Sequence, residues 1–374
     1  MKLKASKADL EATLRVAEIG IAGSGTDLSS HYLFRIHKGA VEVLSFNQRI
    51  CASATLKCEH EGEDGDAFTV EGWRLGKWLG GVGDAVAVEL DQVSQSEIKV
   101  SDPKGSIDLS SLDPAKFPFW DGTFGEAKSV AKVASERLSM AFGYAKNFIS
   151  DNDTTRPEIS QAENLSGSLW ATDKKAVTLI TLPALEKSNL RIHGKDIASV
   201  TKFLGLKGTE EVEILEHDRA VFFLRGDGAM IGASRPVAQF PTLKVDREGD
   251  DAVQWMVRKD SLLHGIQRLS AAAERDNTRL KFSFDKVSGK VVLGVKTVSG
   301  KENTFALDCI EQDNAETLPE EGFWLDYPYI QGIVNHFEGE TVKFGINQRG
   351  KGGYVRFRHT SGEDEFLTVV VWRI

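Results

Sequence analysis

The feature that most constrains this chain is a long internal period. An alternating polar and apolar segment, Ser106–Leu109, is broken by Asp113-Pro114 and followed by Phe117-Pro118. The Phe-Pro pair occurs again at Phe240-Pro241, 123 residues further along the chain. Proline after an alternating segment is typical of a strand that ends in a linker. Three units of this size account for all 374 residues, so the period predicts one structural unit used three times.

The residue pattern within each third predicts the order helix, strands, helix, strands. A helix is expected where apolar residues recur three or four positions apart, as Leu10, Leu14 and Ala17 do. The segments between the helices predict strands, with one expected strand over 164–170. Three helices are expected to follow the N-cap residues Ser6, Ser135 and Asp260, and three more are expected at 73–79, 195–204 and 327–337.

This repetition predicts the α+β fold class, with two helices of each unit packed on antiparallel sheets. The chain is long enough for two or three domains with substantial cores. Because the Phe-Pro linkers mark the ends of the units, we expect three domains, at residues 1–127, 128–250 and 251–374.

The composition is that of an ordinary globular protein, with 41% hydrophobic and 27% charged residues. No apolar run approaches the length of a membrane span, and the first residues read as a strand and a helix rather than as a signal peptide. Cys51, Cys58 and Cys309 lack metal-ligand spacing, which favours a reducing cytoplasm. The net charge of −9 argues against a general nucleic-acid coat, but it allows cations to be concentrated on one inner surface.

The sequence contains no recognisable catalytic motif. The glycine cluster at 20–25 lacks the strand and helix of a phosphate-binding loop, so a flexible loop is expected there. The acidic run at 60–64 is expected to be a solvated turn rather than a metal site. His31, His37 and His193 have no partner at ligand spacing. We therefore expect no catalytic residue, metal or cofactor, although an active site assembled from distant residues stays open as an alternative.

Basic residues recur on the helix faces opposite the core. The simple explanation is a solvated helix surface. A functional role is favoured because such residues occur on five of the six expected helices in a chain that is acidic as a whole. The residues are Arg15, Arg74, Lys77, Lys146, Lys195, Lys202, Arg268 and Arg275.

The C-terminal segment Phe366–Ile374 is apolar almost to its last residue, whereas a terminus is normally polar and frayed. One interpretation is an ordinary edge strand. The other is a last strand whose side chains line a groove for a partner.

Four segments resemble those of a known family, the bacterial DNA sliding clamps, which are the beta subunits of the replicative DNA polymerase. Gly105–Pro118 resembles the end of the family's first domain, and Trp170–Val177 resembles its ATDGHRL segment. Ala238–Pro241 is similar to the FPDY linker, and the ending VVVWRI is similar to VVMPMRL. The departures include Lys174-Lys175-Ala176 in place of Gly-His-Arg, and they suggest a divergent or phage-encoded member.

The resemblance implies three clamp domains per chain and a homodimeric ring that encircles double-stranded DNA without reading its sequence. It implies a processivity factor, not an enzyme, in the cytoplasm or nucleoid of a bacterium or in an infected host cell. The basic helix faces would line the hole, and Ile107, Leu109, Ala272 and Ala273 would lie at the dimer interface. An enzyme with a dispersed active site and a repeat-domain adaptor without DNA stay open as alternatives.

The resemblance also implies a groove between domains 2 and 3 that takes a short linear motif from a DNA polymerase or a clamp loader. Its apolar wall would be Ile159, Thr172, Val177, Pro241, Val370, Trp372 and Ile374, and its polar rim would be Lys174, Lys175 and Arg373.

Overall fold

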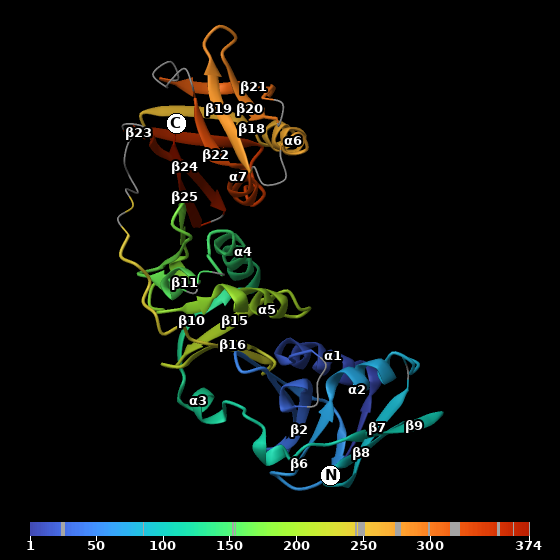
Figure 1. Ribbon diagram of the computed structural model, residues 1–374. Coiled ribbons are helices and arrows are strands. Elements are labelled where there is room, and N and C mark those ends of the chain that lie inside the picture. Colours follow the sequence, from blue (N-terminus) through green and yellow to red (C-terminus); the bar gives the residue numbers. More distant parts are fainter. Residues whose placement is uncertain are drawn as a thin grey trace. The chain divides into compact units, whose positions relative to one another are not determined.

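Figure 1 shows a computed structural model of the chain, which forms two compact units. Unit one contains residues 1–139 and 190–237, and unit two contains residues 140–189 and 238–374. The structure describes residues 1–373 apart from 24–26, 85, 152, 154, 244, 246–250, 274–277, 298–299, 315–321, 350–351 and 362, and it leaves out the side chains of 348, 349, 372 and 373.

The same order of elements occurs three times along the chain. In each third a strand runs directly into a first helix, strands follow, another strand runs directly into a second helix, and three strands end the repeat. In the first repeat these elements are β1 (Lys2–Ser6), α1 (Lys7–Ala17), β2 (His31–His37), β3 (Ala40–Phe46), β4 (Ile50–Leu56), the short β5 (Glu59–Glu61), β6 (Ala67–Glu71), α2 (Gly72–Leu79), β7 (Ala87–Ser94), β8 (Glu97–Asp102) and β9 (Gly105–Ser110).

The second repeat follows a linker that carries the short helix α3 (Asp121–Glu126). It consists of β10 (Lys128–Ala134), α4 (Ser135–Lys146), β11 (Gln161–Leu165), β12 (Ser168–Thr172), β13 (Ala176–Thr181), β14 (Arg191–His193), α5 (Gly194–Leu204), β15 (Glu211–Glu216), β16 (Ala220–Arg225) and β17 (Met230–Ser234). The third consists of β18 (Val253–Arg258), α6 (Lys259–Ser270), β19 (Arg279–Asp285), β20 (Lys290–Lys296), β21 (Glu302–Asp313), β22 (Phe323–Asp326), α7 (Tyr327–Val334), β23 (Thr341–Arg349), β24 (Gly352–Ser361) and β25 (Asp364–Arg373).

The six helices expected from the sequence are confirmed, but two of their N-caps are wrong. Ser6 caps α1, since its side chain accepts a hydrogen bond from the Asp9 backbone N–H at 3.0 Å. Ser135 is instead the first residue of α4. Asp260 lies in the first turn of α6, where its charge favours the helix dipole without capping it. Strands lead directly into both helices, so the sequence lacks the loop that usually marks a helix start.

Two further differences concern short elements. The single strand expected over 164–170 is a hairpin of β11 and β12, with Ser166 and Gly167 at positive φ in its turn. The helix α3 was not expected, because Asp121–Glu126 contains two glycines and has no apolar periodicity.

Unit one contains two antiparallel sheets. Their strand orders are β5-β1-β7-β8-β9 and β10-β15-β16-β17-β4-β3-β2-β6. The helices α1 and α2 contribute Leu10, Leu14, Leu75 and Leu79 to the main core, and each of these leucines is at least nine-tenths buried. Burying each such side chain stabilises the fold by about 2 kcal/mol. The inward face of each helix is thereby fixed, and its polar face is left exposed.

A second cluster in unit one attaches the linker to a sheet. Trp120 and Phe124 make edge-to-face contacts with Phe222 on β16, and Trp120 also contacts Phe46 on β3. The linker that the sequence marks by Phe117-Pro118 is therefore packed onto the sheet by aromatic side chains.

Unit two contains one large sheet with the order β11-β12-β13-β25-β22-β19-β20-β21-β18-β23-β24, in which β24 also pairs with β25. Its largest buried side chain is Trp255, which contacts Phe284, Phe323 and Phe344. The helix α6 covers this core with Leu262, Ile266 and Leu269.

Two strand pairings join successive repeats in the same way. The last strand of the second repeat, β17, pairs with β4, from Met230 opposite Ser53 to Ala233 opposite Ile50. The last strand of the third repeat, β25, pairs with β13, where Val370 lies opposite Ala176. Both β4 and β13 are the third strand after the first helix of the preceding repeat. The last strand of the first repeat, β9, ends its sheet with one edge unpaired among the described strands.

Candidate nucleic-acid and peptide interfaces

The basic residues expected on the helices of unit one are exposed. Arg15 lies on α1 and Lys195 on α5, and neither makes an ion pair with any residue that the structure describes. Lys202, also on α5, lies 3.5 Å from the Glu18 carboxylate. These side chains are exposed because the opposite faces of the helices carry the buried leucine, isoleucine and valine residues.

On α2 the basic residues surround an exposed tryptophan. The Arg74 guanidinium lies 5.5 Å from the Trp73 ring centroid, and the Lys77 ammonium lies 5.9 Å from it. Arg74 also forms a 3.0 Å ion pair with Glu71. Trp73 is 44% exposed. Trp73 was not predicted as a site residue from the sequence, although its position on the helix face that also carries Arg74 and Lys77 was a signal.

In unit two the expected cations have different surroundings. Lys146 on α4 is half-buried and forms an ion pair with Asp151. Arg268 on α6 is exposed and lies 5.8 Å from the Phe305 ring centroid. Arg275 lies outside the described residues. Exposed cations without fixed partners can approach a phosphate backbone at little desolvation cost, whereas Lys146 would first have to leave Asp151.

Residues expected in the peptide groove lie together beside the β13–β25 pairing of unit two. Val370 is 2% exposed and pairs with Ala176, whereas Val177 pairs with Val369, so the Val177 and Val370 side chains project from opposite faces of the sheet. The Thr172 hydroxyl donates to the Ala176 carbonyl oxygen at 2.7 Å, which fixes the turn between β12 and β13. The last strand β25 is not an edge strand, because it pairs with β13, β22 and β24. The edge-strand interpretation of the C-terminal segment is therefore wrong.

The remaining apolar residues of the expected groove are less uniform. Ile159 is 4% exposed, in a short 3₁₀ helix, and Pro241 is half-buried beside Phe240, whose ring contacts Trp170. On β25, Val371 is 56% exposed and its N–H donates to the Lys175 carbonyl oxygen at 2.9 Å. The side chains of Trp372 and Arg373, and all of Ile374, lie outside the described part of the chain.

Lys174 and Lys175 lie in the turn between β12 and β13, and both are exposed and paired. Lys174 has a φ of 84° and forms an ion pair with Asp153. The hydrogen bond that the Lys174 ammonium donates to Asp153, together with one from the Thr155 hydroxyl, lowers the pKa of Asp153 to about 2. Lys175 lies 3.3 Å from the Asp326 carboxylate. The expected polar rim therefore has carboxylates beside its lysines.

The residues expected at a dimer interface divide into two kinds. Leu109 on β9 is 3% exposed and belongs to the core of unit one, whereas Ile107 on the same strand is half-buried. Ala272 and Ala273 follow α6 and are both half-buried. Ile107 is therefore the better placed of the two β9 residues to contact another surface.

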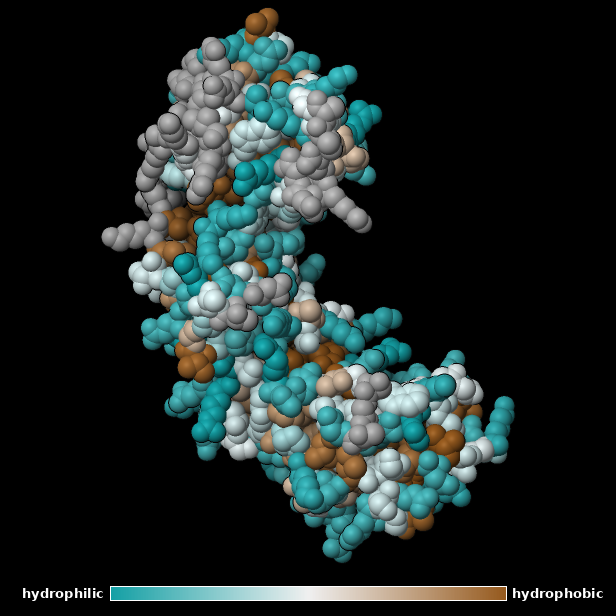
Figure 2. Space-filling model, in the orientation of Figure 1, coloured by the Kyte–Doolittle hydropathy of each residue, from teal (hydrophilic) through white to brown (hydrophobic). Residues whose placement is uncertain are grey.

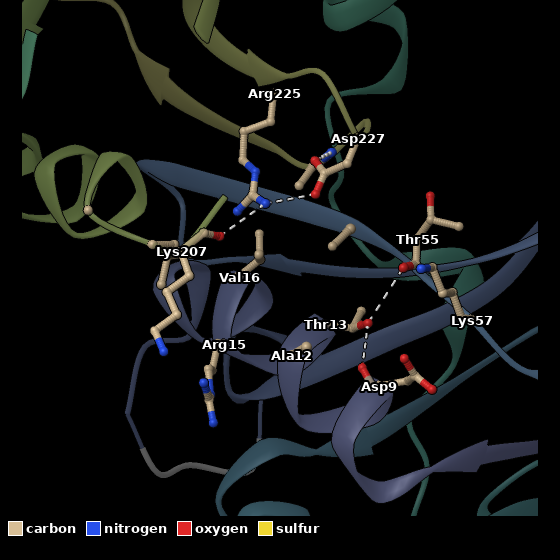
Figure 3. A pocket seen from close by; sticks show the side chains of 14 residues that line it. Asp9, Ala12, Thr13, Arg15, Val16, Thr55, Lys57, Lys207, Arg225 and Asp227 are labelled. Carbon is tan, nitrogen blue, oxygen red and sulfur yellow. Dashed lines mark hydrogen bonds and ion pairs between the residues drawn. The ribbon is translucent and has the colours of Figure 1, made fainter. Parts of the chain in front are cut away.

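Unit one also contains a cavity of about 640 Å³, shown in Figure 3, that was not expected from the sequence. It lies between α1, the end of β4, the end of α5 and the hairpin of β16 and β17. Its charged residues come from segments far apart in the chain, so no local motif reveals them. They are Asp9, Arg15, Lys57, Lys207, Arg225 and Asp227.

The described residues contain no group of His, Cys, Asp and Glu that could hold a metal ion. Within the described part of the chain, no helix is both long and apolar enough to cross a membrane. Hydrophilic side chains cover much of the face seen in Figure 2, with smaller apolar patches between them.

Comparison with solved structures identifies the fold. The sequence matches no protein-family model and no curated protein. Among solved structures, the chain is similar to the DNA polymerase III subunit beta from Pseudomonas aeruginosa, with a TM-score of 0.85, 15% identity and 100% of both chains covered. It is similar to the DNA polymerase sliding clamp from Caulobacter crescentus, with a TM-score of 0.84, 13% identity and 100% of both chains covered.

A third structure, the DNA polymerase III beta subunit from Thermotoga maritima, gives a TM-score of 0.82 at 14% identity, with 100% of this chain and 99% of that chain covered. The likeness therefore extends over all three repeats in each comparison. Over its whole length the chain has the sliding-clamp fold of the DNA polymerase III beta subunits.

Proposed function

We propose that this protein is a DNA sliding clamp, a processivity factor that closes around duplex DNA as a homodimer and tethers a DNA polymerase. The observation that carries the proposal is that repeats are joined by continuing a sheet from one repeat into the next, in the same way at β17–β4 and at β25–β13. A chain built by this rule has one unused strand edge at each end, and two such chains can close a ring. The expected domains 1–127, 128–250 and 251–374 are the repeating units of this proposal.

The same rule identifies the strands that would close the ring. The unused edge of the first repeat is β9, and the strand equivalent to β4 and β13 in the third repeat is β21. In β21 the segment Glu302–Asp308 pairs with β20, while Cys309–Asp313 pairs with β18 on the other side. We infer that β9 of one copy pairs with 302–308 of a second copy, with Ile107 packing near Ala272 and Ala273.

Sliding requires contacts that hold DNA without fixing its position. Exposed arginine and lysine side chains attract phosphates, and they make no base-specific hydrogen bonds that would have to break at each step. We propose that Arg15, Arg74, Lys77, Lys195, Lys202 and Arg268 act in this way, together with Lys146 and Arg275. The overall charge of −9 would keep DNA away from the rest of the surface.

We propose that partners bind beside β13 and β25 through a short extended peptide. Support comes from the register, which places Thr172, Val177 and Val369 on one face of the paired strands, with the exposed Val371 on the same face of β25. Val370, which the sequence also predicted for this wall, projects from the opposite face. Pro241 and Ile159 would extend the apolar wall, and Trp372 and Ile374 would complete it. Lys174, Lys175 and Arg373 would form the polar rim. The partners are a DNA polymerase and a clamp loader, in a bacterial cytoplasm or an infected host cell.

The proposal is tested by retention on closed DNA. The full chain is incubated with a clamp loader, ATP and a nicked circular plasmid, and DNA-bound protein is separated by gel filtration at moderate salt. We expect protein to stay on the circle and to be released when a restriction enzyme linearises it, because topology rather than affinity holds the ring. Protein that stays bound after linearisation, or that binds linear duplex tightly at high salt, would contradict the proposal.

A further inference from the structure

The cavity between α1 and α5 in unit one has the character of an anion-binding site. Four cations and two carboxylates line its volume of about 640 Å³, together with apolar side chains that include Val16, Ala54 and Leu206. Asp9 accepts a hydrogen bond from Ser6 through its side chain and from Thr13 through its backbone carbonyl. The Asp9 carboxylate is therefore already hydrogen-bonded to Ser6, which does not line the cavity.

Arg225 lines this cavity, and Figure 3 shows its hydrogen bonds to Asp227 and to the Lys207 carbonyl oxygen. Its side chain is 10% exposed, and its Nη2 donates to the Asp227 carboxylate at 2.7 Å and to the Lys207 carbonyl oxygen at 3.4 Å. The hydrogen bond to Lys207 satisfies a carbonyl oxygen just beyond the C-terminal end of α5. Without this bond, the partial negative charge of that oxygen would repel an anion. The buried Nε of Arg225 has no hydrogen-bond partner among the described atoms. A buried N–H without a partner is unusual in a native structure and points to a missing acceptor near this side chain.

The other three cations are available. Arg15, Lys57 and Lys207 are exposed and form no ion pair with the residues that the structure describes. Figure 3 shows the head groups of Arg15 and Lys207 on the same side of the cavity. Since Asp227 is engaged by Arg225, the cavity keeps an excess of positive charge from three elements, α1, the end of β4 and the segment after α5.

The corresponding place in unit two is filled. There Tyr144 of α4 makes edge contacts with His336, which follows α7, and with Phe366 of β25. The Tyr144 hydroxyl bonds to the Thr368 hydroxyl at 2.7 Å. Aromatic packing thus occupies the space between the first helix of one repeat and the second helix of the next. The open, cationic version in unit one is a departure from this arrangement that packing alone does not explain.

We infer that this cavity binds a phosphate group. Guanidinium and ammonium groups form strong, charge-assisted hydrogen bonds with phosphate oxygens, and Arg225 is preorganised by burial. The phosphate can come from the DNA backbone or from a free phosphate or nucleotide. The first source rests on the proposed clamp function, and the second does not.

Calorimetric titration with pyrophosphate tests the site on the full chain, in a buffer without divalent metal. The double variant Lys57→Gln/Lys207→Gln removes two cations that lie on the surface, and Lys99→Gln on β8 is the matched control in the same unit. We expect the wild type and Lys99→Gln to bind alike, and the double variant to bind at least about tenfold more weakly. Thermal melts confirm that all three proteins are folded. No heat of binding to the wild type, or equal affinity for the double variant, would overturn the inference.

Competition identifies the source of the phosphate. A short blunt duplex is added to the pyrophosphate complex at low salt. Displacement by the duplex assigns the site to backbone phosphate, and displacement only by a deoxynucleoside monophosphate assigns it to a free nucleotide. The retention experiment on circular DNA is independent, because a ring can hold DNA when this cavity is empty and the cavity can bind pyrophosphate when no ring closes.

Discussion

The imidazole of His359 is packed among aromatic rings in unit two. Its ring stacks on Phe337 with centroids 4.6 Å apart and lies 5.6 Å from Phe366. Burial lowers the pKa of His359 below its ordinary value of 6.5; nearby Lys259 and His336 lower it further, and Glu338 acts in the opposite direction. Protonation of His359 is therefore less favourable in the folded protein than in the unfolded chain.

This difference predicts a pH-dependent stability. Above the unfolded pKa of 6.5 neither state is protonated at His359, and as the pH falls through this value the unfolded state gains a proton first. We expect the melting temperature of unit two to fall between pH 7.5 and pH 5.5. The variant His359→Phe keeps the stacking and should show a smaller fall in calorimetric melts. An equal fall in both proteins would show that His359 is not responsible.

Trp372 has the largest side chain among the residues of the proposed peptide groove. Its backbone lies on β25 opposite Gly353, at the end of the chain that is apolar where a terminus is usually polar. Large aromatic side chains supply much of the binding energy at interfaces, so Trp372→Ala should weaken binding of a polymerase-derived peptide by about 2 kcal/mol.

Fluorescence polarisation with a labelled peptide measures this loss, and Val287→Ala is the control because Val287 is 98% exposed in the turn between β19 and β20. The dimer mass should be the same for all three proteins. Unchanged peptide affinity in Trp372→Ala would remove this residue from the proposed groove.

Among the elements, β9 is the one on whose free edge the proposed ring depends. An unpaired edge strand offers backbone donors and acceptors to another chain. Proline at an exposed edge position removes a donor and blocks pairing, so Asp108→Pro should raise the dimer dissociation constant by about tenfold or more. Sedimentation velocity across a concentration series measures the change, and Lys99→Gln on the neighbouring strand β8 is the control. A dimer of wild-type affinity in Asp108→Pro would exclude β9 from the interface.

The element scale also shows what the sequence can and cannot predict. The helices were predictable because residues such as Leu10 and Leu14 repeat with helical spacing and point into a core. The start of α4 was not, because β10 runs into it at Ser135 without a loop, and a capping serine and a first-turn serine look alike in sequence. The basic helix faces were found by the same periodicity, while Lys57, Lys207 and Arg225 come together only through pairing of distant strands.

For the whole molecule, the proposed function implies that affinity for linear DNA depends on how many phosphates the exposed arginine and lysine side chains neutralise. The logarithm of the binding constant falls linearly with the logarithm of the salt concentration. Each phosphate that a variant no longer neutralises should reduce the magnitude of this negative slope by about 0.9. The triple variant Arg15→Gln/Lys195→Gln/Arg268→Gln removes exposed cations from three helices, so we expect a clearly smaller slope than in the wild type. Fluorescence anisotropy of a labelled duplex over a salt series measures the slope, again with Lys99→Gln as the control. Equal slopes would mean that these helix faces do not meet DNA.

The continuation of sheets from repeat to repeat has a consequence for how such a chain can change over time. Main-chain ladders such as those at Met230–Ala233 and Ala176–Thr181 depend on peptide groups that every residue except proline supplies. Side chains at these seams need only suit a pleated, partly covered surface, so substitutions can accumulate while the architecture persists. This explains how a chain with 13–15% identity to solved clamps keeps their fold from end to end. In such a chain the order of the strands is kept more strictly than the residues that form them.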